Sequence, residues 1–256
     1  MDLGARIKGR RVLITGASGG LGAHFARLCA RHGAAVAVGA RRRSKLDSLA
    51  AELKSLGAAD AVAVDLDVAD EASVEAALQA AEEALGPLDV LVNNAGIGGG
   101  GPALDTLAEE FDRVIDTNLR GVWLMSVAAG RRWRDAGYPG AIVNIASILG
   151  FRVQGGVAPY AVSKAGVVQM TQALALEWAR YGVRVNALAP GYIVTDINAA
   201  FFETDAGKAV IRRVPMRRLG QPEELDAPFL LLATDASPWM TGATIPVDGG
   251  HLVSTL

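Results

Sequence analysis

The sequence is poor in the residues that hold disulfides and metal ions. Its 256 residues contain one cysteine, Cys29, and three histidines. A single cysteine cannot form an intrachain disulfide, and three scattered histidines with one cysteine do not make a metal-ligand cluster. We therefore expect a protein of a reducing compartment, the cytoplasm, that holds no metal ion.

An excess of charge of one sign is also absent. The formal net charge is -2 at pH 7 and the pI is about 6.0, which gives nucleic acid or an anionic membrane no electrostatic reason to bind. No run of about 18 apolar residues occurs, and the N-terminal stretch MDLGARIKGRR is charged where a signal peptide would be apolar. We expect neither a nucleic-acid partner nor a membrane association.

What the sequence does contain is a series of short, β-branched apolar runs between longer Ala/Leu-rich segments of helical period. Hydrophobic residues make up 51% of the chain. The predicted strands are 11–15, 34–38, 61–65, 90–93, 141–145, 184–188 and 244–247. Strands that alternate with helices predict an α/β fold, a Rossmann-like doubly wound parallel sheet of about seven strands that is buried on both faces. No linker interrupts the chain, so residues 1–256 are expected to form a single domain.

A glycine-rich turn, Thr15-Gly-Ala-Ser-Gly-Gly-Leu-Gly22, follows the first predicted strand. Gly16, Gly20 and Gly22 let the chain turn tightly and bring backbone N–H groups and a helix N-terminus up to a pyrophosphate. A nucleoside triphosphate site is disfavoured, because no Gly-Lys-Ser/Thr closes the loop. The turn therefore predicts a dinucleotide site.

Carboxylates are missing where an NAD-specific site would need one. Such a site places Asp or Glu at the end of the second strand, where it binds the ribose hydroxyls. This chain has no Asp or Glu from Leu3 to Leu46. The turn carries three arginines instead, and a guanidinium matches the geometry of a 2′-phosphate. NADP(H) is therefore favoured, with NAD(H) possible. Arg41 is the first candidate for the phosphate contact and Arg42 the second, whereas Arg43 is expected to be solvated.

A proton-transfer pair follows later in the chain. Tyr160 and Lys164 share one helix face, where an ammonium can lower the pKa of a phenol, and Ser147 precedes Tyr160 by 13 residues. Reduction of a ketone needs a hydride from a nicotinamide and a proton from the protein. Tyr160 is the candidate general acid, and Ser147 is expected to hold the carbonyl oxygen. Since the carboxyl ends of parallel strands share one edge, these residues should meet the glycine loop there.

The motifs occur together with Asn93-Asn-Ala-Gly96, Arg218-Leu-Gly-Gln-Pro-Glu-Glu and Val247-Asp-Gly-Gly. From about residue 9 to residue 250 the chain resembles the single-domain branch of the short-chain dehydrogenase/reductase family. The resemblance implies a nicotinamide cofactor, hydride exchange between a secondary alcohol and a ketone, and a homotetramer or homodimer. It also implies that Asn118 joins Ser147, Tyr160 and Lys164 as a fourth catalytic residue that positions a water for the proton relay.

The resemblance further implies cofactor contacts. Lys164 would bind the nicotinamide ribose, Asp67 and Val68 the adenine, and Thr195 the carboxamide. From the motifs and the resemblance together, the expected cofactor-contacting residues are Gly16, Ser18, Gly20, Leu21, Gly22, Arg41, Arg42, Asp67, Val68, Asn94, Ala95, Gly96, Tyr160, Lys164, Pro190, Gly191, Ile193 and Thr195.

Two alternative functions stay open. One is a 3-oxoacyl-[acyl carrier protein] or 3-oxoacyl-CoA reductase, although such dedicated reductases commonly continue the Asn-Asn-Ala-Gly motif with Ile-Thr-Arg-Asp, whereas this chain reads Ile97-Gly-Gly-Gly-Gly-Pro102. The other is a non-catalytic dinucleotide-sensing protein, which would have no need of the Ser-Tyr-Lys set.

The expected substrate is a small-molecule ketone or secondary alcohol. The segment from about 192 to 214 is expected to overhang the nicotinamide, and it contains Ile193, Ile197, Phe201 and Phe202. These apolar side chains favour a medium-sized ketone with an apolar or aromatic substituent over a sugar.

Overall fold

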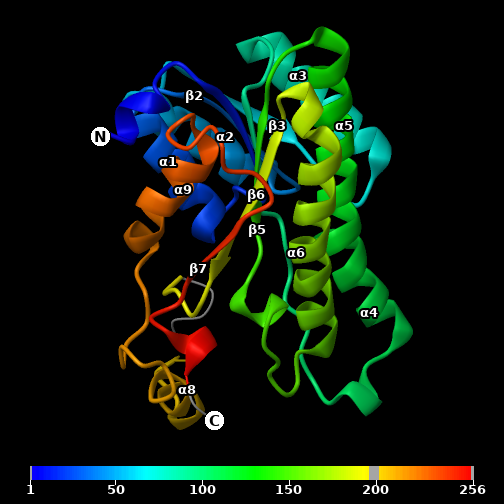
Figure 1. The fold of residues 1–256 in the computed structure, drawn as a ribbon, viewed down its shortest axis with the longest axis vertical. Coiled ribbons are helices and arrows are strands. Elements are labelled where there is room, and N and C mark those ends of the chain that lie inside the picture. The colour runs from blue at the N-terminus through cyan, green and yellow to red at the C-terminus, as the bar shows by residue number, and fades with distance from the viewer. Residues whose placement is uncertain (1, 196–201, 255–256) are drawn as a thin grey trace.

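Seven parallel strands form one sheet through the middle of the structure (Figure 1). The computed structural model describes residues 2–195 and 202–254. The strands are β1 (Arg11–Thr15), β2 (Ala35–Ala40), β3 (Asp60–Asp65), β4 (Val90–Asn93), β5 (Ala141–Ile145), β6 (Arg184–Pro190) and β7 (Thr244–Val247). They lie in the order β3-β2-β1-β4-β5-β6-β7. The order reverses direction at β1, and such a reversal opens a crevice outside the carboxyl ends of β1 and β4.

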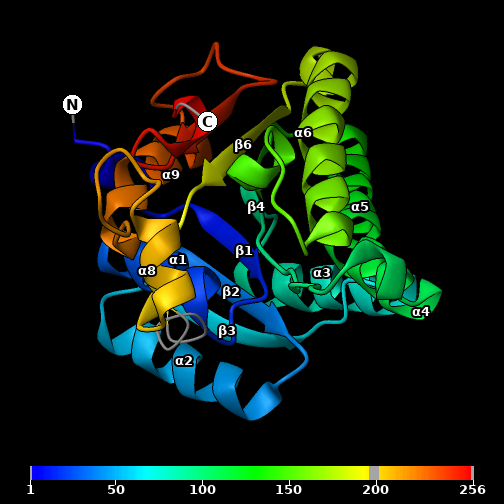
Figure 2. The same cartoon turned by 90° about the horizontal axis from the view of Figure 1, so that it is seen from below.

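Helices cover both faces of the sheet (Figures 1 and 2). One layer contains α1 (Gly20–Arg31), α2 (Arg43–Ser55) and α9 (Asp226–Ala233), and the other contains α3 (Glu71–Leu85), α5 (Gly121–Ala136) and α6 (Ala158–Trp178). The short helices α4 (Ala108–Ile115) and α8 (Asp205–Ile211) lie at the carboxyl end of the sheet.

The strands are apolar at successive positions because each face has its own core. Val12 and Ile14 of β1 pack into the core that α1, α2 and α9 share, whereas Leu13 packs into the core of α3, α5 and α6. All three side chains are completely buried. Side chains alternate between the faces of a strand, so a sheet covered on both sides needs an apolar residue at each step.

The predicted fold class is confirmed, and the predicted strands agree with the observed ones to within two residues at each end. β2 continues to Ala40 because Gly39 and Ala40 still pair with β3, and β6 continues to Pro190 because that residue pairs with Val247 of β7. Residues 196–201 of the predicted substrate segment, with Ile197 and Phe201, lie outside the described residues.

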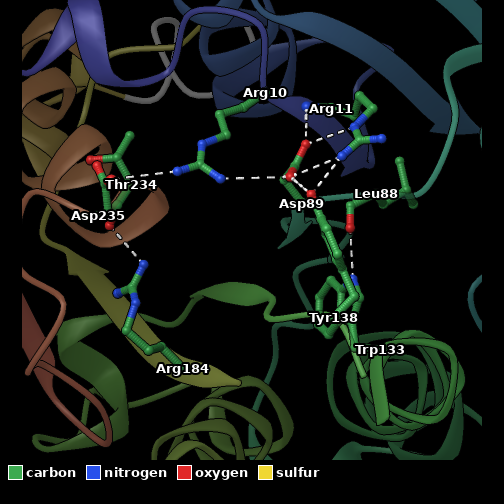
Figure 3. Close-up of polar contacts among 9 residues, drawn as sticks. All are labelled: Arg10, Arg11, Leu88, Asp89, Trp133, Tyr138, Arg184, Thr234 and Asp235. Carbon is green, nitrogen blue, oxygen red and sulfur yellow. Dashed lines mark hydrogen bonds and ion pairs between the residues drawn. The ribbon is translucent and has the colours of Figure 1, made fainter. Parts of the chain in front are cut away.

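A polar cluster ties the strands together at the amino edge of the sheet (Figure 3). The backbone N–H and Nε of Arg11, at the start of β1, both donate to Asp89 Oδ2 at 2.8 Å, and Arg11 Nη2 donates to Asp89 Oδ1 at 3.1 Å. The Tyr138 hydroxyl, just before β5, also donates to Asp89 Oδ1. Asp89, which is 6% exposed, thereby fixes the starts of β1, β4 and β5 relative to one another.

The cluster extends towards α9. The Arg10 guanidinium lies 3.6 Å from Asp89 Oδ1 and 3.5 Å from Asp235 Oδ2. Arg184, at the start of β6, donates to the carbonyl oxygens of Leu232 and Thr234 at 3.2 and 2.7 Å. The charged contacts at the amino edge thus extend from the start of β1 to the end of α9 and the start of β6.

We predict that Asp89→Asn lowers the free energy of unfolding by about 2–4 kcal/mol, because it leaves Arg11 without its charged partner in a largely buried site. Urea unfolding measures the change. Asp135→Asn, which removes the exposed ion pair with Arg134, is the control and should leave the urea midpoint unchanged.

The pH dependence follows from the same contacts. Burial raises the pKa of Asp89, but the hydrogen bonds from Arg11 and Tyr138 outweigh it and hold this pKa below its ordinary value. The ion pair therefore stabilises the fold fully above the ordinary carboxylate pKa of about 4, and its contribution is lost as the pH falls through the lowered pKa. The stability difference between wild type and Asp89→Asn should shrink from about pH 7 to about pH 3. A constant difference over this range would contradict the assignment.

Candidate active site

A cavity of about 530 Å³ opens at the carboxyl edge of the sheet, where the strand order reverses. Its walls come from the ends of β1 to β6 and the segments that follow them, as expected when parallel strands end at a common edge. The predicted catalytic and cofactor-contacting residues all line this cavity except Gly22 and Asn118.

The floor of the cavity is the contact between the glycine loop and the segment after β4. Thr15 Oγ1 accepts hydrogen bonds from the backbone N–H groups of Asn94 and Ala95 at 3.0 and 2.9 Å, and Asn94 Nδ2 donates to the Thr15 carbonyl at 2.9 Å. A Cβ at Gly16 would lie 2.6 Å from Ala95 Cα, and the φ of Gly16 is +66°. Only glycine suits such a position.

Gly22 makes the second close approach of the loop. A Cβ there would lie 2.4 Å from Asn94 Nδ2 and 2.7 Å from the Gly16 carbonyl oxygen. Gly22 does not line the cavity, but its missing side chain lets the first turn of α1 lie close to Asn94 and to the Gly16 carbonyl. Helix α1 begins at Gly20, and no side chain caps its first turn. The glycines of the loop leave space in front of the N–H groups at the start of α1. This arrangement fits the pyrophosphate of a dinucleotide.

The three arginines after β2 differ in their surroundings. Arg42 Nε and Nη2 donate to Ser18 Oγ at 3.1 and 2.8 Å, so this guanidinium lies beside the glycine loop. The Arg41 side chain is 72% exposed, and its Nη1 lies 3.9 Å from Asp67 Oδ2. Arg43 forms ion pairs with two exposed aspartates, Asp47 and Asp65, as expected for a solvated residue.

Ser147, which follows β5, and Tyr160 and Lys164, on α6, line the same cavity as the glycine loop. The Ser147 hydroxyl accepts from the Leu149 N–H at 3.1 Å, and it lies close enough to the Tyr160 hydroxyl to affect the pKa of that phenol. Lys164 Nζ lies 5.6 Å from the centre of the Tyr160 ring and donates to the Ile145 carbonyl at 2.7 Å. Two hydroxyls and an amino group thus share one site.

Burial shifts the pKa of both titratable groups. The Lys164 side chain is 5% exposed, and burial lowers its pKa to about 8, since desolvation disfavours the ammonium. Burial also raises the pKa of Tyr160, and the nearby Ser147 hydroxyl offsets only part of that rise. Among the chain's own groups, desolvation of the phenolate dominates, and the expected lowering of this pKa by Lys164 together with the charge of an oxidised nicotinamide stays a prediction.

Asn118 lies behind the cavity, in a π-helical segment, Asp116–Arg120, between α4 and α5. Its side chain is completely buried. Asn118 Oδ1 accepts from the Ile97 N–H at 2.8 Å, and its Nδ2 donates to the Ile97 carbonyl at 2.9 Å and to Ser163 Oγ at 3.2 Å. Ser163 in turn donates to the Tyr160 carbonyl at 2.7 Å. The amide thereby joins the segment after β4 to helix α6.

The end of β6 supplies the remaining predicted residues. The Gly191 N–H donates to the Val247 carbonyl at 2.9 Å, and a Cβ at Gly191 would lie 2.7 Å from Asp248 Cα. Ile193 forms an isolated parallel bridge with Gly220. The contacts of Gly191 hold the chain after β6 against the end of β7, and the Ile193 bridge holds it against the segment before α9.

Several cavity-lining residues were not predicted. Most directly adjoin predicted ones at strand ends, so the strand-end rule applied to whole segments could have found them. Thr117 gave no such signal, because it comes from the junction of α4 and α5. The unpredicted lining residues are Gly19, Ala40, Leu66, Ile97, Gly98, Thr117, Ile145, Ala146 and Tyr192.

Metal-binding and membrane-spanning features are absent from the residues that the structure describes. Within 2–195 and 202–254, no three His, Cys, Asp or Glu side chains gather as metal ligands would. No helix in these ranges is both long and apolar enough to cross a membrane.

Known proteins share this chain's sequence and fold. The family model described as enoyl-(acyl carrier protein) reductase matches residues 16–251. L-Rhamnose 1-dehydrogenase (NAD(P)(+)) of Azotobacter vinelandii is 40% identical over 96% of this chain and 97% of its own. A 3-oxoacyl-[acyl-carrier-protein] reductase of Thermotoga maritima is 38% identical over 97% of this chain and 100% of its own.

A solved structure agrees with these sequence matches. The crystal structure of a gluconate 5-dehydrogenase from Burkholderia cenocepacia J2315, in complex with NADP and tartrate, superposes with a TM-score of 0.92 at 36% identity, over 98% of this chain and 99% of that one. The matches cover 96–98% of this chain at 36–40% identity, so the likeness extends beyond the fold to the sequence. The chain therefore belongs to the short-chain dehydrogenase/reductase family of NAD(P)-dependent oxidoreductases.

Proposed function

We propose that the chain interconverts a ketone and a secondary alcohol with Tyr160 as the general acid and base. The observation that carries this proposal is that Ser147, Tyr160 and Lys164 line the same cavity as the glycine loop. Two hydroxyls in one cavity can reach one substrate oxygen, where Tyr160 exchanges the proton and Ser147 stabilises the developing charge. The bound dinucleotide supplies or accepts the hydride.

Lys164 has two tasks in this proposal. Its buried ammonium favours the ionised form of the nearby phenol, although the phenol's own burial opposes that effect. An ammonium also has three donors, and the described contacts give Nζ one hydrogen-bond acceptor, the Ile145 carbonyl. Two donors therefore stay available for the ribose hydroxyls of the dinucleotide.

For Asn118 we propose a positioning role. Its amide uses both of its polar atoms on Ile97 and Ser163 and does not line the cavity. Asn118 would therefore position a water of the proton relay indirectly, by fixing the Ile97 backbone and the helix that carries Ser163.

The preference for NADP(H) is part of the proposal. Arg41 and Arg42 line the cavity, and the Arg42 guanidinium already binds Ser18 of the glycine loop. A carboxylate that lines the cavity, that of Asp67, lies after β3, 3.9 Å from Arg41 Nη1. A 2′-phosphate would meet two guanidinium groups here, which favours the phosphorylated dinucleotide.

The names of the relatives specify different substrates. These are a neutral sugar, a sugar acid and a 3-oxoacyl thioester on a carrier protein. The thioester relative supports 3-oxoacyl reduction as a second candidate function. An advantage of more than about tenfold in kcat/KM for a 3-oxoacyl thioester over simple ketones, roughly 1.4 kcal/mol in transition-state binding, would favour that candidate.

We also propose a single domain, a homotetramer or homodimer, and a cytoplasmic location. One sheet takes strands from both ends of the chain, which supports a single domain. Trp123 and Leu176, 47% and 84% exposed, line a groove of about 630 Å³ on α5 and α6, and a second copy would cover this apolar surface. The single cysteine supports a reducing compartment.

Removal of the transferable proton should abolish turnover and spare cofactor binding. We predict that Tyr160→Phe loses at least about 100-fold in kcat, since general acid–base catalysis contributes roughly 10²- to 10⁴-fold. NADPH affinity, measured by fluorescence titration, should stay within about threefold, whereas Lys164→Ala should lose both activity and affinity. Tyr181→Phe, at the surface, is the control. More than about a hundredth of the wild-type rate in Tyr160→Phe would exclude Tyr160 as the general acid.

Loss of either arginine should reduce the cofactor preference. We predict that Arg41→Ala and Arg42→Ala each raise the KM for NADPH about tenfold or more and leave that for NADH nearly unchanged, since a charge-assisted hydrogen bond contributes about 1.5–3 kcal/mol. Arg43→Ala, which breaks only contacts with Asp47 and Asp65, is the matched control. Equal efficiency of the wild type with NADH and NADPH, with no effect of either variant, would show that these arginines are ordinary surface charges.

A further inference from the structure

Tyr192 lies where three segments of the chain meet beside the proposed catalytic residues. It lines the cavity and is close enough to Tyr160 to influence its ionisation. Its hydroxyl donates to Gln154 Oε1, and its ring centroid lies 5.7 Å from that of Phe202 and 5.4 Å from that of His251. The segment after β5, the segment after β6 and the C-terminal turn thus form one outer wall.

Arg152 joins this wall from the segment after β5. Its Nη1 donates to the His251 carbonyl and, at 2.8 Å, to Ser254 Oγ, which uses both protons of that nitrogen. The contacts within the described ranges give Nε and Nη2 no partner, and they include no ion pair to Arg152. The Nε–H and Nη2–H bonds of a guanidinium are parallel and match the two oxygens of a carboxylate.

The surroundings of Arg152 are positively charged. Burial raises the pKa of Tyr192, and the charges of Arg213 and Arg152 oppose this rise. Burial lowers the pKa of His251, and the same two arginines lower it further. The carboxylate near this ring, Asp248, accepts from the backbone N–H groups of Gly250 and Leu252. An anion at this wall would therefore gain electrostatic energy.

The geometry points to a substrate with a carboxylate at the end remote from its reacting carbon, bound by the Nε and Nη2 of Arg152 on the outer wall, beside the cavity-lining Tyr192. The inference rests on the proposed function, because Ser147 and Tyr160 define where the reacting oxygen lies. Tyr192, which lines the cavity, and its partner Gln154 offer neutral polar groups for hydroxyl groups of the substrate. The favoured substrates are oxo acids and hydroxy acids, in preference to neutral sugars or simple ketones.

A matched pair of ketones tests this inference. With NADPH, 4-oxocyclohexanecarboxylate and 4-oxocyclohexanecarboxamide present the same ring and carbonyl and differ in charge. We expect kcat/KM of the wild type to be at least about tenfold higher for the carboxylate, because a charge-assisted bidentate contact is worth that much or more. Arg152→Met should lower the carboxylate value about 10- to 100-fold and leave the carboxamide value within about twofold.

Three further variants distinguish the loss of the Arg152 guanidinium from disturbance of the C-terminal turn, to which Arg152 also donates. Ser254→Ala removes one contact of the C-terminal turn and keeps Arg152, so the preference for the carboxylate should persist. Arg152→Lys keeps the charge but lacks the parallel donors, so it should recover only part of the preference. Arg180→Met removes an arginine that stacks 4.8 Å from the Tyr181 ring and controls for the loss of one positive charge.

Calorimetric titration of the wild-type enzyme with NADP⁺ and either ketone measures the same preference without turnover. The carboxylate should bind at least about tenfold more tightly. Equal or undetectable binding of the two, or an equal loss of activity toward both in Arg152→Met, would overturn the carboxylate site and leave the proposed function intact. Failure of the wild type to bind NADPH, or to reduce any ketone of a broad panel, would overturn the proposed function instead.

Discussion

The contact between β1 and the segment after β4 determines the position of the rest of the site. Thr15 is 1% exposed, and its hydroxyl accepts two backbone N–H groups of that segment. Each buried N–H that lost this partner would cost about 1–3 kcal/mol. The hydrogen bonds bring the two backbones so close that Gly16 and Gly22 have no room for a side chain. Their missing side chains leave the space in front of α1 open.

The two edges of the sheet handle buried charge in opposite ways. At the amino edge, Asp89 has Arg11 and Tyr138 as partners, and the cluster aligns the strands. At the carboxyl edge, Lys164 is as deeply buried but donates to a backbone carbonyl oxygen, that of Ile145, instead of a carboxylate. A buried ammonium without a counter-ion has a lowered pKa, here about 8. Its charge is therefore free to act on Tyr160 and on a bound dinucleotide.

The sequence predicted the fold because one rule places the ends of parallel strands at a common edge, and the motifs with the family resemblance added most cavity-lining residues. The contacts and burial of these residues depend on the three-dimensional structure. Asn118 bonds to Ile97 and Ser163, which lie 21 and 45 residues away. The direction of the pKa shift of Tyr160 depends on burial that spacing does not reveal. Tyr192 adjoins predicted residues, but its partners come from two other segments.

The Val247-Asp-Gly-Gly motif explains how the C-terminal turn reaches the site. Asp248 accepts the N–H groups of Gly250 and Leu252, and Gly249 and Gly250 have φ values of 63° and 83°, so the chain turns back toward Tyr192 as soon as β7 ends. The outer wall thus consists of irregular segments, whereas glycine and buried hydrogen bonds fix the floor. Irregular segments tolerate sequence change better than a close-packed floor does. The relatives that are 36–40% identical to the chain differ in the substrates for which they are named, and sequence change in the outer wall is a route to such differences that leaves the floor untouched.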